Sequence, residues 1–329
     1  MSATTIMGGL VDAHAHLTLD LEDAGLAPGP GRVPINVAAA WSTGVLALRD
    51  AGSRDGIAAA QLDPARQVAA GPFLAPEGGY HAHLMVPTAP GALVEAVIAQ
   101  ARAGTRWIKV IADFPGADGN WFGAPANYEV DEIARAVAAA HAHGARVMAH
   151  VSGPLVDALV RAGVDSIEHG PLIEEPLLAE MAQRGTLWCP TVATIERHLA
   201  PLRGKAPAID EQFARWPRTL PAAVALDVAL LVGTDELGPR GLAAEAEALV
   251  RLGGLAPRDV VHAATAGARA ALDLPAVAGD SATFDGDPAV DVTALGRVLE
   301  VRPDRARLHP AAPARSPAAG SRWCPRRSR

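Results

Sequence analysis

The chain has 329 residues, a mass of 33.8 kDa and a formal net charge of −7, and half of its residues are apolar. Such a composition excludes an intrinsically disordered chain, because there is enough apolar surface for a large core. The acidic balance, with a pI near 5.9, argues against nucleic acid or an anionic membrane as a partner.

The first predicted element is an apolar strand from about residue 10, which opens into His14-Ala15-His16. Side chains alternate between the two faces of a strand, so both imidazoles point the same way, with Cβ atoms about 7 Å apart. Two imidazoles at a strand end form half of a metal site. The same His-X-His spacing recurs at His81/His83 and at His141/His143, so it does not identify a site by itself.

Apolar runs and segments of helical periodicity then alternate along the chain. Further strands are predicted at 44–50, 67–76, 106–113, 146–151, 165–170, 186–191 and 229–235. Helices are predicted at 35–43, 91–103, 130–143, 154–162, 174–184, 208–226, 241–252 and 257–271. Because buried parallel strands are continuous apolar runs, this alternation predicts an α/β protein with a (β/α)₈ barrel. An open doubly wound sheet is the alternative, although no glycine-rich phosphate loop follows the first strand.

Polar residues recur where the predicted strands end, which is where a barrel of this kind carries its functional groups. They are His14, His16, Lys109, His150, His169 and Asp235. A single histidine at a strand end is commonplace, but four imidazoles, an amine and a carboxylate at one barrel mouth are hard to explain by packing. The alternative for Lys109 is a lysine whose amine reaches the surface, and its position inside the apolar run 107–111 disfavours that alternative.

In order and spacing, these motifs resemble the amidohydrolase superfamily of metal-dependent hydrolases. The resemblance is carried by Val11–His16, Trp107–Val110, Ala149-His150, Ser166–Gly170 and Gly233–Asp235. More narrowly, Gly78-Gly79 before the histidines of that loop, together with Gly163–Gly170, resembles the branch of imidazolonepropionase-like proteins and Xaa-Pro dipeptidases. Ser152 stands where dipeptidase-like relatives often carry Tyr or His, which argues against dipeptidase specificity.

The resemblance implies a site with two divalent ions, most often zinc. One ion would be held by His14, His16 and Asp235, the other by His150 and His169, and Lys109, carboxylated by CO₂, would bridge them as a carbamate. The ions would activate a hydroxide for attack, and Asp235 would act as the general base and then the general acid. His81 and His83 are expected to contact substrate, with a solvated loop as the alternative.

The expected function is hydrolysis of a C–N bond in an amide, cyclic amide or dipeptide-like substrate. Two alternatives stay open. The same site could hydrolyse phosphotriesters or lactones, or the chain could be an inactive, truncated homologue that serves at most as a binding module. The expected partner is a small-molecule substrate, with neither nucleic acid nor a membrane, and a homo-oligomer is left open.

Four segments are expected along the chain. Residues 1–8 would be a remnant of an N-terminal β-sandwich, 9–273 the hydrolase barrel, 274–302 a partial β-sandwich and 303–329 a disordered tail rich in Arg, Pro, Ala and Ser. The two cysteines, Cys189 and Cys324, make no disulfide framework, and Cys189 is expected to be a buried thiol. Without a secretory leader or a membrane-length apolar run, the expected location is the cytoplasm.

Overall fold

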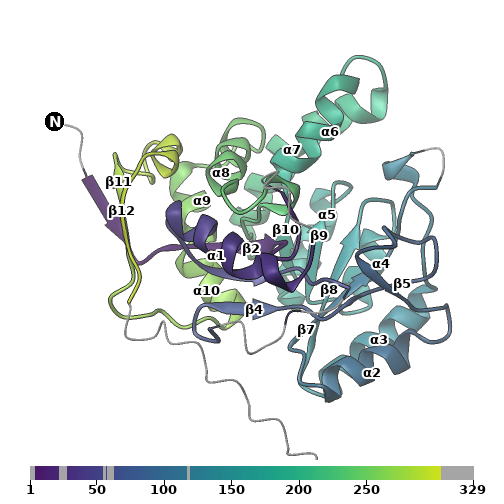
Figure 1. Ribbon diagram of the computed structural model, residues 1–329. Coiled ribbons are helices and arrows are strands. Elements are labelled where there is room, and N and C mark those ends of the chain that lie inside the picture. The colour runs from purple at the N-terminus through teal and green to yellow at the C-terminus, as the bar shows by residue number, and fades with distance from the viewer. Residues whose placement is uncertain (1–3, 22–27, 55–56, 58–62, 117–118, 305–329) are drawn as a thin grey trace, which may run out of the picture.

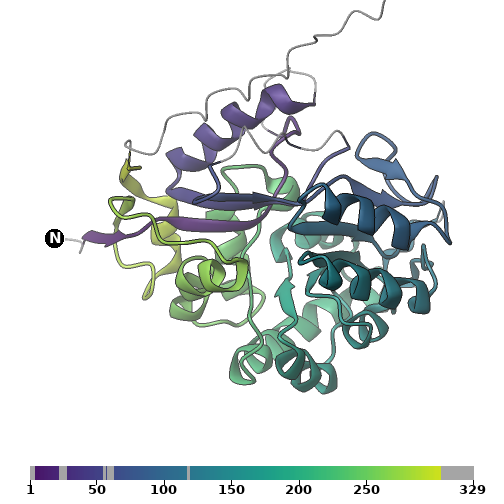
Figure 2. The ribbon, with the colours of Figure 1, turned by 90° about the horizontal axis from the view of Figure 1, so that it is seen from below.

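The computed structural model describes residues 4–21, 28–54, 57, 63–116 and 119–304 (Figure 1). All but the first two residues of the predicted disordered tail, 303–329, lie outside these ranges. Within them, parallel strands occupy the centre and helices surround them. In Figure 2 the helices form an outer ring whose colour runs from purple through teal to green around the molecule. The predicted α/β class is confirmed.

Nine short parallel strands form two sheets, and hydrogen bonds join these sheets to each other. The strands are β2 (Leu10–Ala15), β3 (Val45–Asp50), β4 (Gln67–Ala69), β5 (Phe73–Ala75), β6 (Met85–Pro87), β7 (Trp107–Ile111), β8 (Arg146–Val151), β9 (Ser166–His169) and β10 (Leu187–Cys189). One sheet has the order β2-β3-β4 and the other the order β10-β9-β8-β7-β5-β6. Nearly every residue of these strands is buried, as expected for parallel strands covered on both faces.

Two further links connect the edges of these sheets. After β4, Ala70 forms a parallel bridge with Trp107 of β7. After β10, the segment around Leu230 bridges Trp188, and Val232 accepts a hydrogen bond from the backbone N–H of Ala13 in β2. The hydrogen bonds therefore pass from strand to strand around a ring, which is the arrangement expected of a (β/α)₈ barrel.

None of the described α-helices has a side-chain hydrogen bond at its N-cap, and four of them carry proline in the first turn. The helices are α1 (Val33–Ser42), α2 (Leu93–Arg102), α3 (Val130–Ala142), α4 (Val156–Arg161), α5 (Glu175–Arg184), α6 (Val192–Leu199), α7 (Pro207–Ala225), α8 (Leu242–Arg251), α9 (Pro257–Ala263) and α10 (Ala266–Leu272). Helix α3 has Asp131 and Glu132 in its first turn and His141 in its last, which suits the helix dipole. None of the described helices is both long and apolar enough to cross a membrane.

The structure departs from the predicted elements in several places, among them the predicted strand 67–76, which is divided into β4 and β5. The predicted strand 229–235 is reduced to the bridge at Leu230, and Asp235 begins a short 3-10 helix, η5 (Asp235–Leu237). The predicted helix 257–271 is split into α9 and α10, because the carbonyl of Ala264 accepts a hydrogen bond from the backbone of Val11 instead of continuing the helix. Helix α6, which begins two residues after Pro190, was not predicted.

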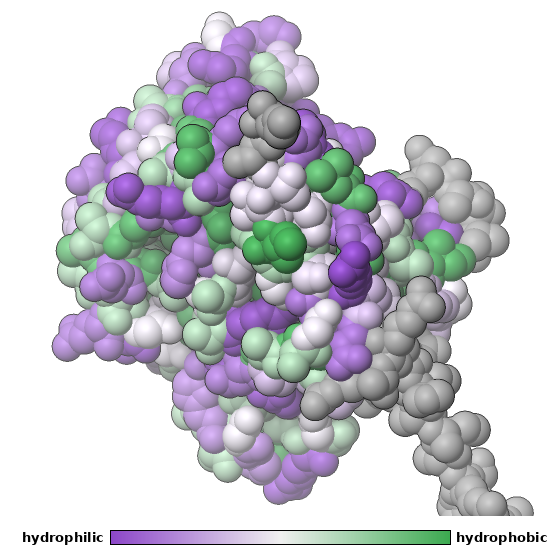
Figure 3. All heavy atoms as spheres, turned by 90° about the vertical axis from the view of Figure 1, so that its left-hand side faces the viewer, coloured by the Kyte–Doolittle hydropathy of each residue, from purple (hydrophilic) through white to green (hydrophobic). Residues whose placement is uncertain are grey.

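A small antiparallel sheet lies beside the barrel and joins the two ends of the described chain. Strand β1 (Thr4–Met7) pairs with β11 (Ser281–Asp285), which pairs with β12 (Val298–Arg302). Figure 3 looks onto this side, where apolar residues form separate patches among hydrophilic ones. The sheet brings together the segments expected to carry the sandwich, 1–8 and 274–302, while the domain limits themselves stay a prediction.

Buried carboxylates fasten neighbouring loops at one end of the barrel. Asp50 accepts from the backbone N–H of Leu17, and Asp113 accepts from those of Ser152 and Gly153. Asp12 accepts from the backbone and hydroxyl of Thr234, and Glu245 accepts from Val192 and Ala193 at the start of α6. Each bond joins the end of one strand, or the helix beside it, to a different loop, so these carboxylates hold the loops around the barrel mouth in fixed relation.

Candidate active site

Three of the predicted site residues meet at the ends of strand β2 and of the segment around Leu230. One ligand atom from each of His14, His16 and Asp235 lies within 4.8 Å of the other two, and all three residues are buried. Asp235 Oδ1 lies 3.1 Å from His16 Nε2 and 3.9 Å from His14 Nε2. Burial alone would raise the pKa of the Asp235 carboxyl, but the hydrogen bond to His16 and the neighbouring imidazoles hold it below its usual range.

The other two predicted histidines lie against this cluster. The ring centres of His150 and His169 are 4.6 Å apart, and His169 is 5.2 Å from His14. Both nitrogens of His150 are buried with no hydrogen-bond partner among the described residues. Burial holds the pKa of both rings below the ordinary value for histidine, so both rings are neutral near pH 7. A neutral, buried imidazole without a partner is the form that binds a metal ion.

Lys109 lies inside the barrel and not at its surface. Its side chain is 1% exposed, and its Nζ is 5.7 Å from the centre of the Phe73 ring. Burial lowers the pKa of the Lys109 amine to about 8, although the nearby carboxylates of Glu168 and Asp235 oppose the shift. The alternative of a lysine that reaches the surface is therefore wrong. With this pKa, about a tenth of the amine is uncharged at pH 7, and only the uncharged amine attacks CO₂.

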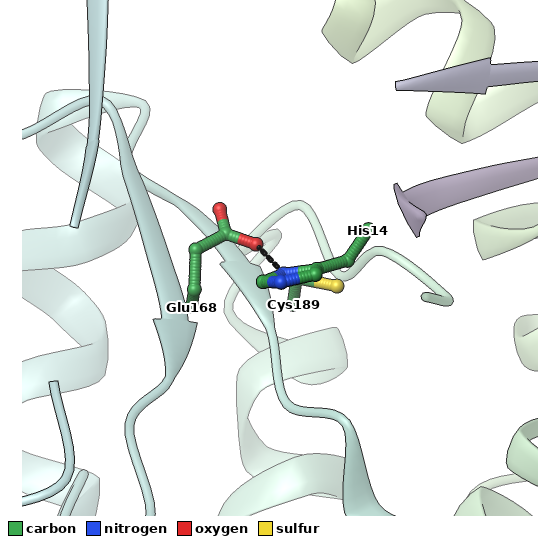
Figure 4. A group of neighbouring side chains, drawn as sticks. All are labelled: His14, Glu168 and Cys189. Atoms are coloured by element: carbon green, nitrogen blue, oxygen red, sulfur yellow. Dashed lines mark hydrogen bonds and ion pairs between the residues drawn. The ribbon is translucent and has the colours of Figure 1, made fainter. Parts of the chain in front are cut away.

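Glu168 was not predicted as a site residue, yet it holds His14 in place. Figure 4 shows the two side chains pointing toward each other from β9 and β2, with Cys189 beside them. His14 Nδ1 lies 2.5 Å from Glu168 Oε2, and Arg49 donates to Oε1 of the same carboxylate at 2.9 Å. Because Arg49 is fully buried against Glu168, the carboxylate stays charged and accepts a hydrogen bond from Nδ1–H of His14. The lone pair of His14 Nε2 is thereby directed at the cluster.

His14, Glu168 and Cys189 also offer three ligand atoms within 4.8 Å of one another. Two observations count against a metal site there. The carboxylate already pairs with Arg49, and burial raises the pKa of the Cys189 thiol well above its ordinary value, so the thiol stays protonated. The expectation of a buried Cys189 thiol is confirmed, and the three residues are better suited to orient His14 than to bind an ion.

Backbone strain gathers at this site. Among the described residues other than glycine, five have positive φ angles, and three of these, His169 (68°), Thr191 (45°) and Asp235 (48°), lie together. His169 Nδ1 is 2.7 Å from Thr191 Oγ1 and 3.8 Å from Asp235 Oδ2. The left-handed conformation is uncommon for such residues and costs free energy, so its concentration here indicates a functional arrangement.

A cavity of about 230 Å³ opens onto the cluster. Its base contains His150, His169 and Asp235, and its remaining lining consists of Tyr80, His81, Trp121, Phe122, Ser152, Pro171, Thr194, Ile195, His198, Leu199 and Glu236. His81 thus lines the cavity, whereas the exposed His83 is outside the lining, with its ring centre 5.9 Å from that of His81. His198, which the sequence did not point to, lies on the lining, 2.7 Å from Glu236.

The comparison with known proteins decides the family. A model of the amidohydrolase family matches residues 5–280. The chain belongs to the amidohydrolase family. It is accordingly a hydrolase for amide-type bonds, from a family that generally uses divalent metals.

Two relatives illustrate the similarity in amino-acid sequence. An uncharacterized protein of Mycobacterium tuberculosis (strain ATCC 25618 / H37Rv) is 32% identical over 266 residues, which cover 75% of this chain and 69% of that protein. The ochratoxinase of Aspergillus niger is 29% identical over 184 residues, which cover 53% of this chain and 37% of that protein.

Solved structures share the fold. A Xaa-Pro dipeptidase with bound methionine superposes with a TM-score of 0.70 at 22% identity, covering 91% of this chain and 85% of the other. The crystal structure of A. niger ochratoxinase gives a TM-score of 0.70 at 22% identity, covering 90% and 81%. At these identities, the likeness shows the common architecture of this family member and its neighbours.

Proposed function

We propose that this amidohydrolase cleaves an amide-type C–N bond with the help of two divalent ions, expected to be zinc. The observation that carries the proposal is the convergence of five neutral or acidic ligand groups at one barrel mouth. They are His14, His16, His150, His169 and Asp235. A crystal structure of the family's fold, that of atrazine chlorohydrolase TrzN from Arthrobacter aurescens TC1, is described as complexed with zinc, with a TM-score of 0.56 at 15% identity.

The residues themselves fit such ions. The unpartnered nitrogens of His150 and Nδ1 of His16 are buried polar atoms, which cost free energy unless a ligand satisfies them. His14, His16 and Asp235 would hold one ion, and His150 and His169 the other. Bound ions would supply Lewis acidity and lower the pKa of water near the substrate.

Lys109 would complete the ligand set between the two groups. Its uncharged amine forms an N–C bond to CO₂ and releases one proton, which leaves an anionic carbamate in place of a repelled ammonium. Burial at 1% exposure, with an amine pKa of about 8, supports this reaction at neutral pH. Replacing Lys109 by Ala should reduce bound metal, with partial recovery on addition of a short carboxylate such as acetate.

Asp235 would act as the general base and then as the general acid. Its Oδ1 is engaged with His16, while Oδ2 lies 3.8 Å from His169. The carboxylate is therefore held beside the reacting groups with one oxygen able to take a proton and pass it to the leaving nitrogen.

Elemental analysis of the purified chain tests the proposal. About two divalent ions per chain are expected for the natural sequence, and a loss for His14→Ala and for His169→Ala. His143→Ala, at an exposed position after α3, is the matched control and should keep its metal. If the natural chain binds no ion after metal supplementation, the proposal is wrong. Activity on a panel of amides, a lactone and a phosphotriester then identifies the bond cleaved.

A further inference from the structure

One wall of the cavity is a layer of packed aromatic rings. Tyr80, Trp121 and Phe122 line it, and Phe114 braces it from behind, with ring centres 5.0 Å from Tyr80 and 5.5 Å from Trp121. The pairs Tyr80–Phe114 and Phe114–Trp121 meet edge to face, and Trp121, which is 38% exposed, lines the cavity. A planar aromatic group could pack against this layer.

A second group of lining residues is also apolar. Ile195 and Leu199 of α6 line the cavity together with Pro171. The uncharged polar groups of the lining include the hydroxyls of Ser152, Thr194 and Tyr80 and the indole N–H of Trp121. Neither group of lining residues contains a lysine or arginine side chain, and neither residue type occurs elsewhere among the described residues that line the cavity. The internal segments outside the described ranges, 22–27, 55–56, 58–62 and 117–118, contain none in their sequence.

Apart from the Tyr80 phenol, the ionisable side chains of the described lining are carboxylates and imidazoles. Glu236 contributes a carboxylate at the mouth, 2.7 Å from His198, so any positive charge on that imidazole is already matched. Burial and the neighbouring His83 lower the pKa of His81 below the ordinary histidine value, which leaves that ring neutral. Away from the proposed ions, a free carboxylate on the non-reacting part of a substrate would therefore meet Glu236 and no cationic side chain among the described lining residues.

We propose that this cavity selects uncharged aryl amides and rejects amides that carry a free carboxylate. The inference rests on the proposed function and names the substrate class of that site. It separates the chain from its dipeptidase-like structural neighbours, because every dipeptide brings a C-terminal carboxylate. Two like charges near a protein surface repel by an amount that is reduced by solvent and salt, so the expected discrimination is about tenfold or more.

The test uses two compounds that differ only in the carboxylate: N-benzoyl-2-phenylethylamine and N-benzoyl-phenylalanine. Both release benzoate on cleavage of the same bond. With the metal-loaded chain, kcat/KM for the neutral compound should be at least about tenfold higher, and calorimetry should show a Kd lower by a similar factor. Equal values, or a preference for the anion, would overturn the inference.

Glu236→Gln identifies the source of the discrimination. The amide keeps the shape and a hydrogen bond to His198 but removes the charge, so the ratio between the two compounds should fall several-fold. Glu95→Gln removes the same charge from an exposed position on α2, and its ratio should match that of the natural chain. A ratio that is unchanged in Glu236→Gln would contradict the assigned role of this carboxylate.

The binding measurement keeps this inference separate from the proposed function. If neither compound is cleaved and no metal is bound, the proposed function fails, while the two dissociation constants still decide the selectivity. If metal is bound and the anionic compound binds as well as the neutral one, the function stands and the inference fails. If neither compound binds at millimolar concentration, the assignment of aryl amides is wrong.

Discussion

Asp235 combines contacts with several histidines and a strained backbone conformation. It contacts His16, lies near His14 and His169, and adopts a φ of 48° at the start of η5. A regular strand through this point would put the side chain elsewhere, so the loss of strand geometry after Val232 is what aims the carboxylate at the cluster. The strained conformation is thus part of how the site is assembled.

Asp235→Asn should separate catalysis from metal binding. The amide retains the shape and one oxygen for a ligand contact but cannot take up a proton. We expect most of the metal to remain and kcat to fall by about 10²–10⁴-fold, the usual contribution of a general base. Metal content and kcat measured on the same preparation check this. Retention of kcat at full metal occupancy would point instead to the pair His198 and Glu236.

The sequence indicated the ligand-type residues because they lie in or just after predicted apolar strands, which can be located from apolar runs, although Lys109 proves to lie in the middle of β7 and Asp235 in η5. It did not indicate Glu168 as part of the site, although this residue stands next to His169 in a quoted motif. Its importance depends on Arg49, which is 119 positions away, and on His14, 154 positions away. Such partnerships become visible only when the strands are placed beside one another.

At the scale of elements, close backbone approach fixes the turn after β3. Gly52 has φ of +105°, and a Cβ atom at this position would lie 2.3 Å from the backbone oxygen of Gly71. Gly52 also donates its N–H to Asp50, which holds Leu17 of the preceding loop. A side chain here would therefore disturb the fastening between two loops of the barrel mouth.

Gly52→Ala should lower the free energy of unfolding by about 2–4 kcal/mol, the combined effect of an unfavourable φ and an overpacked contact. Gly144, which follows α3 with φ of +73° and open space around its Cβ position, provides the control. Gly144→Ala carries the φ cost alone, about 1 kcal/mol. Urea unfolding of both variants measures the difference, and equal losses would show that the contact with Gly71 is easily relieved.

Most helices and strands followed from periodicity and glycine stops, since burial in a parallel sheet requires apolar runs. Elements that depend on tertiary packing could not be predicted from these local patterns. Helix α6 begins two residues after Pro190, with a start held by Glu245 from α8, and no local cap announces it. Helix α7 continues through Pro217 and Pro221 because its buried face, which includes Phe213 and Trp216, outweighs the local cost.

At the scale of the molecule, Glu245 links stability to pH. Burial raises the pKa of its carboxyl to about 8 from the ordinary 4.5, although the two backbone N–H donors oppose this. The protonated form is therefore favoured in the folded state. The contribution of Glu245 to stability is full below about pH 4.5, and it is lost as the pH rises through about 8, because ionisation of the buried group then opposes folding.

Glu245→Gln removes this titration and keeps an oxygen acceptor. The free energy of unfolding of the natural chain, relative to that of the variant, should fall as the pH is raised from about 4.5 to about 8. Denaturant unfolding at several pH values, with metal content held constant, measures the slope. A flat difference across this range would mean that the two amide donors keep the carboxylate charged at every pH.

The carboxylates that fasten the barrel mouth have a consequence for how new specificities arise in such a chain. Among the described residues, Asp50, Asp113 and Glu245 accept hydrogen bonds from main-chain nitrogens of their loops and from no side chain. At Leu17, Ser152, Val192 and Ala193 any residue except proline supplies that nitrogen, whereas a Cβ atom at Gly52 or Gly153 would meet a backbone oxygen at 2.3 or 2.8 Å. Mutations can therefore exchange the side chains at these four positions while the attachment points survive. Lineages can therefore diversify the substrates they accept without rebuilding the frame that holds the ligand cluster, and the record of that divergence should lie in the loop side chains, with the acidic anchors left in place.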